Sequence, residues 1–353
     1  MAEIKQPFKT DISVLLLFHA RTDHFSKVWA EVRKARPARL FLFQDGARMT
    51  DKDGREVSDW TESRDYEGIM ALRELVSDEH IDWQCEVHRN YQDRNLGCDP
   101  AGYMSQQWAF SQTDKCMVLE DDCVPSQSFF PFCKEMLDRY EHDERVTMIA
   151  GFNTDEKTPP DEIGGASYFF TRVFSIWGWA SWARVILNRD GDYGFVKDAT
   201  QFALLQKKVE QYGQRKDMSA MCQWHAGSGK QYFESIFWAY MLLHDGLAIM
   251  PSVNMISNIG LEGGTHYSTQ LDLVPKRLRR IFTMKRLELD FPLIHPSEIR
   301  EYPAYQDRHY LRNAWNNPWR KVQYSLEELW LNLKAGNISQ ILQSVKNRIG
   351  KSF

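Results

Sequence analysis

The first third of the chain alternates short, almost wholly apolar runs with amphipathic helical patterns. The apolar runs are ISVLLLFHA, RLFLFQDG, WQCEVHRNY and KCMVLEDD, and segments such as HFSKVWAEVRKA lie between them. Strands that are buried on both faces and connected through helices are typical of a parallel α/β sheet. We therefore predict such a sheet for about residues 1–123, with ligands bound at the carboxyl ends of its strands.

Polar side chains follow three of these predicted strands. They are His19 and Arg21 after the first strand, Gln44 and Asp45 after the second, and Glu120, Asp121 and Asp122 after the fourth. Adjacent carboxylates repel one another, and burying them without a partner is costly. The triplet therefore indicates either a site for a hard cation such as Mn²⁺ or Mg²⁺, or turn and N-cap residues ahead of the next helix.

The composition narrows the classes of partner. The net charge of -4 and the pI near 6.2 disfavour a nucleic-acid binder, which would usually be basic. The chain carries 12 Trp, 14 Tyr and 20 Phe, which indicates either a Trp-rich core or surfaces on which sugars or bases stack.

The six cysteines form no C-x-x-C pair and no Cys/His spacing suited to zinc. No apolar run is long enough for a signal peptide or a membrane span. We predict a cytoplasmic protein, and any contact with a membrane would be peripheral, at its inner face. The basic stretch PKRLRRIFTMKR is either a solvated helix face or a surface for anionic lipid or a polyprenyl-diphosphate acceptor.

Several families that place acids at strand ends are disfavoured by missing motifs. The chain has no G-x-x-x-x-G-K-[ST] loop, no G-x-G-x-x-G after its first strand and no Asp-x-Asp-x-Thr loop near its start. Nucleotide-sugar transferases and nucleotidyltransferases are the enzyme classes that remain for a strand end of this kind.

The segment VLEDDCVPSQSFFPFC resembles the acidic metal motif of GT-A glycosyltransferases, and it is most similar to the N-acetylglucosaminyltransferase I type and its bacterial polysaccharide-cluster relatives. WGWASW and PSVNMISNIGLEGGTHY resemble further motifs of the bacterial branch, in the same order. The resemblance covers about residues 10–296. It implies an α/β GT-A fold with a mixed central sheet flanked by helices and a helical C-terminal extension.

The expected domain spans residues 1–290, with a nucleotide-binding half to about 123 and an acceptor half from 124. Residues 291–353 would be a connector and amphipathic helices. Their apolar residues at helical spacing, such as Leu326, Leu329 and Leu333, would pack on the domain, form a homodimer or bind a membrane interface.

The resemblance also implies roles for the polar strand ends. Asp122 would bind the metal, while Asp121 and Glu120 would contact the ribose or metal-bound water. Asp45 would accept a hydrogen bond from a uracil ring and Arg21 would face the base, unless Arg21 is simply a helix-start residue. Ala101 stands where the eukaryotic enzymes carry a base-contacting His, so UDP is the expected donor nucleotide but other bases stay open.

Inverting glycosyl transfer needs a general base on the acceptor side. The resemblance places this base at Glu234, at the start of a helix after a glycine-bearing loop, HAGSGKQ, that we expect to act as a lid. Glu234 could instead be favoured there by the helix dipole, and Asp155 is the alternative base. His266 would be a further metal or diphosphate ligand.

Trp177 and Trp179 would form the floor of the sugar site, although their alternation also suits a half-buried strand.

The sequence thus predicts a metal-dependent, inverting hexosyl- or N-acetylhexosaminyltransferase that uses Mn²⁺ or Mg²⁺. It would move a sugar from a nucleotide-diphosphate donor to a hydroxyl of a glycan or lipid-linked precursor. The alternatives are a sugar-nucleotidyltransferase and an inactive glycan-binding protein of the same fold.

Overall fold

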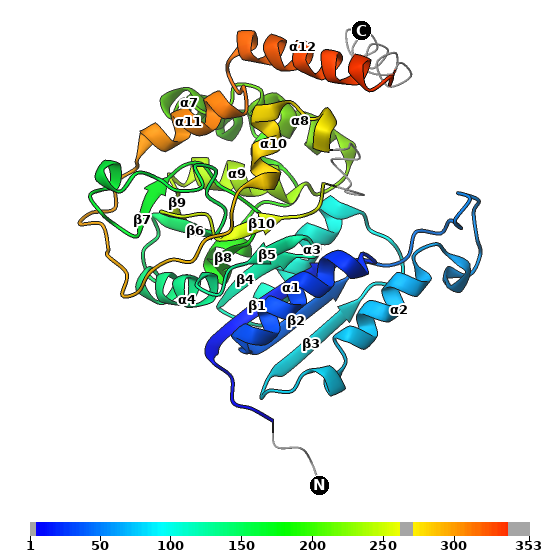
Figure 1. The fold of residues 1–353 in the computed structure, drawn as a ribbon. Coiled ribbons are helices and arrows are strands. Elements are labelled where there is room, and N and C mark those ends of the chain that lie inside the picture. Colours follow the sequence, from blue (N-terminus) through cyan, green and yellow to red (C-terminus); the bar gives the residue numbers. More distant parts are fainter. Residues whose placement is uncertain (1–4, 262–270, 338–353) are drawn as a thin grey trace.

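The computed structural model describes residues 5–261 and 271–337, and its centre is an eight-stranded sheet (Figure 1). The order across this sheet is β3-β2-β1-β4-β8-β6-β9-β7, and β10 and β5 form a second, two-stranded sheet. The strands are β1 (Thr10–Phe18), β2 (Pro37–Gln44), β3 (Glu86–Tyr91), β4 (Lys115–Glu120), β5 (Cys123–Pro125), β6 (Val146–Ala150), β7 (Tyr168–Thr171), β8 (Trp179–Trp182), β9 (Leu247–Pro251) and β10 (Ile256–Asn258).

The helices lie around this sheet (Figure 1). They are α1 (Thr22–Ala35), α2 (Tyr66–Leu75), α3 (Cys98–Phe110), α4 (Phe129–Arg139), α5 (Ala183–Ile186), α6 (Gly194–Lys197), α7 (Ala199–Gln211), α8 (Met218–Ser228), α9 (Phe233–Leu243), α10 (Lys276–Thr283), α11 (Pro303–Arg312) and α12 (Pro318–Lys334).

The N-terminal half of the sheet is parallel, as the sequence predicted. β1 pairs in parallel with both β2 and β4, and β2 pairs in parallel with β3. Leu15 and Phe41, which are fully buried, are register partners in the middle of β1 and β2. Because Phe18 pairs with Gln44 and Leu17 with Glu120, the polar strand ends meet at one edge of the sheet.

The second half makes the sheet mixed. β8 is antiparallel to both β4 and β6, β9 is parallel to β6, and β7 closes the edge antiparallel to β9. The prediction of an α/β fold with a mixed central sheet flanked by helices is therefore confirmed.

The segment 225–231, which we expected to be a loop, begins inside a helix, so that part of the prediction is wrong. α8 continues to Ser228 and ends at Gly229, whose φ of 72° is left-handed. The ring of His225 stacks on Tyr232 at 3.8 Å, and its Nδ1 lies 2.8 Å from the Ser235 hydroxyl. These contacts hold the end of α8 against the start of α9.

The two helices of the C-terminal segment differ in how they pack. Tyr305 of α11 is fully buried and its ring lies 5.1 Å from that of Phe169 on β7. α12 lies at the outside of the molecule (Figure 1) and leaves large apolar side chains exposed, among them Trp319 at 80% and Leu326 at 61%. α11 thus packs as part of the domain body, and the predicted boundary near residue 290 stays a prediction. In the described part of the chain, no helix combines the length and the apolar character that crossing a bilayer requires.

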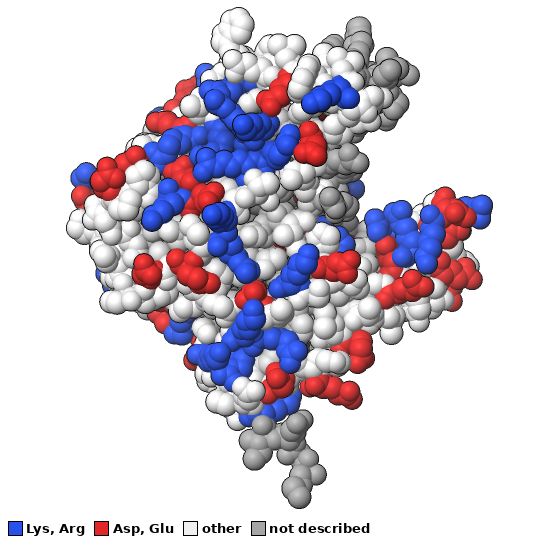
Figure 2. All heavy atoms as spheres, viewed as in Figure 1, with Lys and Arg blue, Asp and Glu red and all other residues white. Residues whose placement is uncertain are grey.

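The basic stretch 276–286 forms α10 and the turn after it. Figure 2 shows lysine and arginine side chains gathering over α10 and α11 on one face of the molecule. Arg279 pairs with Asp272 at 3.1 Å and Arg286 with Glu31 at 3.5 Å, so part of this charge is used within the chain. A role in lipid contact stays a prediction.

Candidate functional site

The three carboxylates after β4 lie beside Arg21, which follows β1. We refer to Glu120, Asp121, Asp122 and Arg21 as the acid cluster. Arg21 Nη2 donates to Asp122 Oδ2 at 2.8 Å and also to Asp121 Oδ1, while its Nε donates to Asp121 Oδ2 at 3.2 Å. Burial opposes the charge of the guanidinium, but Asp121 and Asp122 outweigh this and raise the pKa of Arg21. Its Nη1 is buried without a hydrogen-bond partner.

The small β5–β10 sheet forms the floor beneath Asp122. Asn258 pairs with Cys123 in this sheet, and its Nδ2 lies 3.4 Å from Asp122 Oδ1. The backbone N–H of Ile259 donates to the Asp122 carbonyl at 2.9 Å. A Cβ at Gly260 would come within 2.0 Å of Asp122 Oδ2, so only glycine fits where the chain passes this carboxylate.

Glu120 shows that the cluster holds more negative charge than Arg21 neutralises. Desolvation raises the pKa of Glu120 well above its ordinary value, and Asp122, Asp121 and Glu234 raise it further. Desolvation also raises the pKa of Asp121, although Arg21 works against the shift. Glu234, the predicted base, is therefore one of the carboxylates whose charge acts on Glu120.

Asp45 lies at the end of β2, next to β1, and its carboxylate binds the chain itself. It accepts hydrogen bonds from the backbone N–H groups of Gly46, Leu96 and Gly97 at 2.9, 2.8 and 3.1 Å, and from Asn95 Nδ2 at 2.9 Å. Burial raises the pKa of Asp45, and these amides partly offset the rise. Asp45 therefore holds the turn that leads into α3, and its contact with a base stays a prediction.

A cavity of about 410 Å³ is lined in part by Glu234, and we call it the aromatic cavity. Residues 172–177, α8, α9, and α11 with the residues that follow it contribute to its wall. The lining side chains include Thr154, Arg172, Ser175, Trp177, Gln214, Arg215, Glu234, Tyr305, His309, Asn313 and Trp315. Glu234 lines this cavity from the first turn of α9, and it is also one of the carboxylates that raise the pKa of Glu120.

Trp177 and Trp179 occupy different environments. Trp177 is half-buried, lines the aromatic cavity and packs edge-on against Phe152 at 4.7 Å. Trp179 is fully buried in β8 and its ring lies 5.5 Å from that of Phe237. Gly178, with a φ of 65°, separates the two residues and interrupts the alternation of side chains. Trp179 is therefore a core residue in this structure rather than part of a sugar-site floor.

Asp155 does not lie with its carboxylate open to a substrate. It accepts from Arg308 Nη2 at 2.7 Å and from Arg312 Nη2 at 3.0 Å, and its side chain is only 6% exposed. Next to it, Thr154 Oγ1 lies 3.0 Å from His309 Nδ1. These contacts attach α11 to the domain, so Asp155 is better suited to holding the cavity wall than to removing a proton.

Two observations bear on the fit of a divalent cation to the acid cluster. His266 lies outside the described residues, and within the described ranges no three His, Cys, Asp or Glu side chains converge as ligands. Burial and the neighbouring carboxylates disfavour the charged form of Glu120, and Mn²⁺ or Mg²⁺ bound among these carboxylates, with phosphate oxygens completing its coordination, would relieve that penalty.

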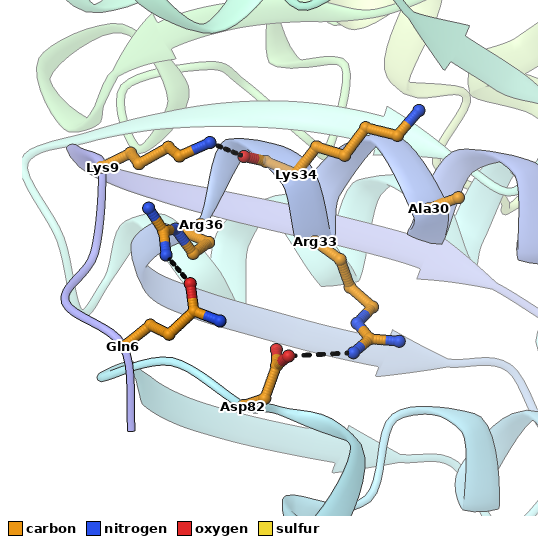
Figure 3. Close-up of a pocket in the computed structure, with 7 residues that line it drawn as sticks. All are labelled: Gln6, Lys9, Ala30, Arg33, Lys34, Arg36 and Asp82. Carbon is orange, nitrogen blue, oxygen red and sulfur yellow. Dashed lines mark hydrogen bonds and ion pairs between the residues drawn. The ribbon is translucent and has the colours of Figure 1, made fainter. Parts of the chain in front are cut away.

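A second hollow lies near the amino end of β1 (Figure 3) and has a volume of about 420 Å³. Lys9 donates to the Lys34 carbonyl at 3.1 Å, Arg36 donates to Gln6, and Arg33 pairs with Asp82 at 3.2 Å (Figure 3). Its cations thus connect the N-terminal segment, α1 and the residues before β3. This arrangement is structural, and it lies at the end of β1 opposite to the acid cluster.

Residues that the sequence did not single out complete both parts of the site. Asn258 and Gly260 lie within the segment PSVNMISNIGLEGGTHY, but their place under Asp122 depends on the β5–β10 pairing. Tyr305 and His309 are four residues apart on α11, a spacing that could have indicated a buried helix face.

No protein-family model matches the chain, and no curated protein matches it. Among solved structures the chain is similar to the glycosyltransferase GlyE of Streptococcus pneumoniae, at 10% identity over 57% of this chain and 40% of that chain, with a TM-score of 0.27. The galactosyltransferase LgtC, solved with donor and acceptor sugar analogs, matches at 10% identity over 75% of this chain and 90% of that chain, with a TM-score of 0.30. A protein from Bacillus anthracis, described as a glucose-1-phosphate thymidylyltransferase, matches at 9% identity over 66% and 96%, with a TM-score of 0.29. Scores this low carry no argument, and the proposals below depend on the residues of this chain.

Proposed function

We propose that the chain is a metal-dependent glycosyltransferase of the GT-A type. It moves a sugar from a nucleotide-diphosphate donor, UDP-linked in the first instance, to a hydroxyl of a glycan or lipid-linked precursor. The observation that carries this proposal is that Glu234 lines the aromatic cavity and is also one of the carboxylates that raise the pKa of Glu120 in the acid cluster. A donor site and an acceptor site that meet at one carboxylate are what glycosyl transfer requires.

The acid cluster is the donor end in this proposal. Asp122 would hold Mn²⁺ or Mg²⁺ together with diphosphate oxygens, and Asp121 and Glu120 would contact the ribose or metal-bound water. The bound cation would neutralise the diphosphate and stabilise the charge that develops as it leaves. For Asp122 to bind the cation, its ion pair with Arg21 must open, and the released guanidinium is then available to the nucleotide.

Glu234 is the general base in this proposal. Its carboxylate takes the proton of the acceptor hydroxyl as the acceptor oxygen bonds to the anomeric carbon. The bond from that carbon to the diphosphate oxygen breaks, and its electron pair leaves with the nucleotide diphosphate. Attack from the face opposite the leaving group inverts the anomeric carbon. The transferred group would be a hexosyl or N-acetylhexosaminyl residue.

The same proposal places the enzyme in the cytoplasm, with peripheral contact to the inner face of a membrane or with a second copy of the chain. The exposed apolar residues of α12, including Trp319 and Leu326, support a contact of this kind.

Nucleotide binding gives the decisive test. We expect UDP or a UDP-sugar to raise the melting temperature of the full chain only when Mn²⁺ or Mg²⁺ is present. Asp122→Asn keeps the shape of the side chain and removes its charge. Because even indirect partners of a metal contribute about 10–100-fold to its affinity, we expect this variant to bind the nucleotide at least about 100-fold more weakly.

Asp11→Asn is the matched control, since Asp11 is exposed near the other end of β1 and should not affect binding. Nucleotide binding that is equally strong without the metal and in Asp122→Asn would contradict the proposal. Turnover of a nucleoside triphosphate with a sugar 1-phosphate would indicate a nucleotidyltransferase instead, and glycan binding without nucleotide binding would indicate an inactive binding protein.

A further inference from the structure

The helix α12 turns its apolar side away from the domain. A helix on the surface of a globular protein normally buries its apolar stripe. In α12 the buried residues are Tyr324 and Asn332, and the Tyr324 hydroxyl donates to the Arg312 carbonyl at 2.7 Å. Six large apolar side chains recur every one to four residues on the side that faces away from Tyr324, and all six are exposed: Trp319, Val322, Leu326, Leu329, Trp330 and Leu333. We call these six side chains the α12 stripe.

The position of α12 lets the α12 stripe reach a flat surface. The helix lies at the outside of the molecule (Figure 1), and its 17 residues make it about 26 Å long. Trp319 is 80% exposed and Trp330 is 59% exposed. Indole rings are apolar but carry one N–H donor, and they are enriched where the hydrocarbon of a bilayer meets the headgroups. The stripe therefore has the side chains and the outward position that contact with a bilayer surface requires.

Lysine and arginine side chains accompany the α12 stripe. The backbone N–H of Lys276, the first residue of α10, donates to Glu327 of α12 at 2.9 Å, so the exposed Lys276 and Arg277 lie beside α12. Figure 2 shows further basic side chains over α10 and α11 on the same face. These cations could contact the phosphates of a surface on which the stripe rests.

The excess of basic residues holds for the whole sequence around α12. Residues 262–286 contain six Lys or Arg and two acids, and residues 318–353 contain another six Lys or Arg and two acids. A second copy of the chain would present the same patch, and an isologous contact would bring like charges together. Anionic lipid headgroups are complementary to this charge, so a membrane is the partner that the surface favours.

We propose that α12 docks the chain on an anionic lipid bilayer. The α12 stripe enters the layer between headgroups and acyl chains, the two indoles lie at the level of the headgroups, and Lys276 and Arg277 contact lipid phosphates. This inference takes the peripheral contact of the proposed function further. It names lipid rather than a second copy as the partner, and α12 with the start of α10 as the surface.

The docking also brings the aromatic cavity close to the bilayer. Trp315 lines that cavity and comes three residues before Pro318, where α12 begins, which is at most about 11 Å of chain. A lipid-linked acceptor would then lie near the cavity. This consequence rests on the proposed function, whereas the docking itself does not.

Vesicle binding tests the inference on the full chain. The probes are vesicles of phosphatidylcholine alone and vesicles of equal parts phosphatidylcholine and phosphatidylglycerol, and bound protein is separated by flotation. We expect the chain to bind the anionic vesicles at least about tenfold more tightly than the neutral ones.

Two exposed indoles locate the contact on α12. The double variant Trp319→Ser with Trp330→Ser should weaken binding to the anionic vesicles at least about tenfold, because it removes apolar area that the bilayer would bury. Both positions are exposed, so the melting temperature should not change. Trp224→Ser is the matched control, because Trp224 is 66% exposed but lies on α8, and it should leave vesicle binding unchanged.

Two exposed cations test the charge. The double variant Lys276→Gln with Arg277→Gln should weaken binding to the anionic vesicles about 25-fold, or about fivefold for each cation. Lys52→Gln with Arg55→Gln removes two cations with side chains 75% and 76% exposed in the segment after β2, and this control should bind as the unaltered chain does.

Several outcomes would overturn the inference. They are the absence of vesicle binding, equal binding to both kinds of vesicle, and binding that stays as strong without Trp319 and Trp330. A lipid-free dimer that the same two substitutions dissociate, measured by sedimentation velocity, would also overturn it, because a second copy would then cover the α12 stripe.

The docking and the transferase proposal can fail separately. Asp122→Asn lies outside the docking surface and should bind vesicles as the unaltered chain does. Vesicle binding without metal-dependent UDP binding would leave the docking in place and contradict the transferase proposal. Metal-dependent UDP binding without vesicle binding would contradict the docking alone.

Discussion

The acid cluster and the aromatic cavity differ in how their charges are arranged. In the acid cluster, Arg21 pairs with Asp121 and Asp122, and burial together with the neighbouring carboxylates raises the pKa of Glu120 well above its ordinary value. In the aromatic cavity, Arg172 and Arg215 each pair with a carboxylate, and burial keeps His309 neutral. Among the described residues, the first region therefore brings carboxylates together at a cost that a cation would relieve, whereas the arginines of the second are engaged within the chain.

The difference also shows in how the two regions are built. The acid cluster comes from residues next to one another in sequence and from neighbouring parallel strands. The aromatic cavity takes its wall from several helices and loops that no common strand order brings together, and two of its lining residues, Thr154 and His309, are 155 residues apart. The acid cluster should therefore respond mainly to changes of charge, while the cavity should also respond to changes that loosen packing.

Glu234 offers the largest test of this comparison, since it lines the cavity and its charge acts on Glu120 of the acid cluster. Glu234→Gln should lower kcat by about 10²–10⁴-fold, which is the usual contribution of a general base. It should leave the metal-dependent affinity for the nucleotide within about twofold, because the acids that would bind the donor are unchanged. Steady-state kinetics and nucleotide titrations measure the two quantities.

Glu79→Gln is the control, because Glu79 is exposed on the turn before β3. Unchanged kcat in Glu234→Gln would show that another group removes the proton.

Asp155 tests the attachment of the cavity wall. Asp155→Ala should lower the free energy of unfolding by about 3 kcal/mol, because it leaves Arg308 and Arg312 without the buried carboxylate that they share. Urea unfolding followed by tryptophan fluorescence measures this change. In activity assays the acceptor KM should rise and the donor KM should not.

Asp53→Ala is the matched control, because Asp53 and Arg55 form an ion pair with side chains 67% and 76% exposed. Such a pair contributes only about 0–1 kcal/mol. An equal loss of unfolding free energy in both variants would show that Asp155 has no special role in attaching α11.

The buried ring of His309 makes the stability of the protein depend on pH. The pKa of this buried ring falls from 6.5 to about 3, so acid protonates the unfolded chain first and favours unfolding. Its contribution is complete above pH 6.5 and is lost as the pH falls toward 3. At about pH 5 the loss should be about 2 kcal/mol, measured as a shift of the urea midpoint.

Replacing the ring should reduce this slope. His309→Gln should flatten the acid limb of the stability curve, while His142→Gln, at an exposed position, should leave it unchanged. A slope that persists in His309→Gln would assign the acid sensitivity to another group.

Arg21 gives the smallest expected effect. Arg21→Gln should strengthen the binding of free Mn²⁺ about tenfold in the absence of nucleotide, because it removes the cation that competes for Asp121 and Asp122. Titration by electron paramagnetic resonance measures the free ion. Arg33→Gln, in the hollow of Figure 3, is the control and should not change Mn²⁺ affinity. Weaker Mn²⁺ binding in Arg21→Gln would show that Arg21 supports the metal site instead of opposing it.

Local pattern was sufficient for the first half of the fold. The apolar runs around Leu15 and Phe41 are strands in the structure, and the segment from Phe25 to Ala35 belongs to α1, because buried parallel strands and crossover helices have distinct hydrophobic periods. The meeting of Arg21 with the acid triplet also follows from strand order, once β1 and β4 are neighbours. Trp177 and Trp179 were harder to separate, because the backbone at Gly178 interrupts the alternation between them.

The apolar strands of the first half, their polar ends and the row of carboxylates after β4 can all be recognised in the sequence, because each depends on residues close together in the chain. The pairing of Asp155 with Arg308 and Arg312, the burial of Trp179 in the core, and the place of α11 in the wall that Glu234 also lines become visible in the folded chain. These features depend on contacts between distant segments, and hydrophobic period and motif spacing carry no information about which distant segments meet.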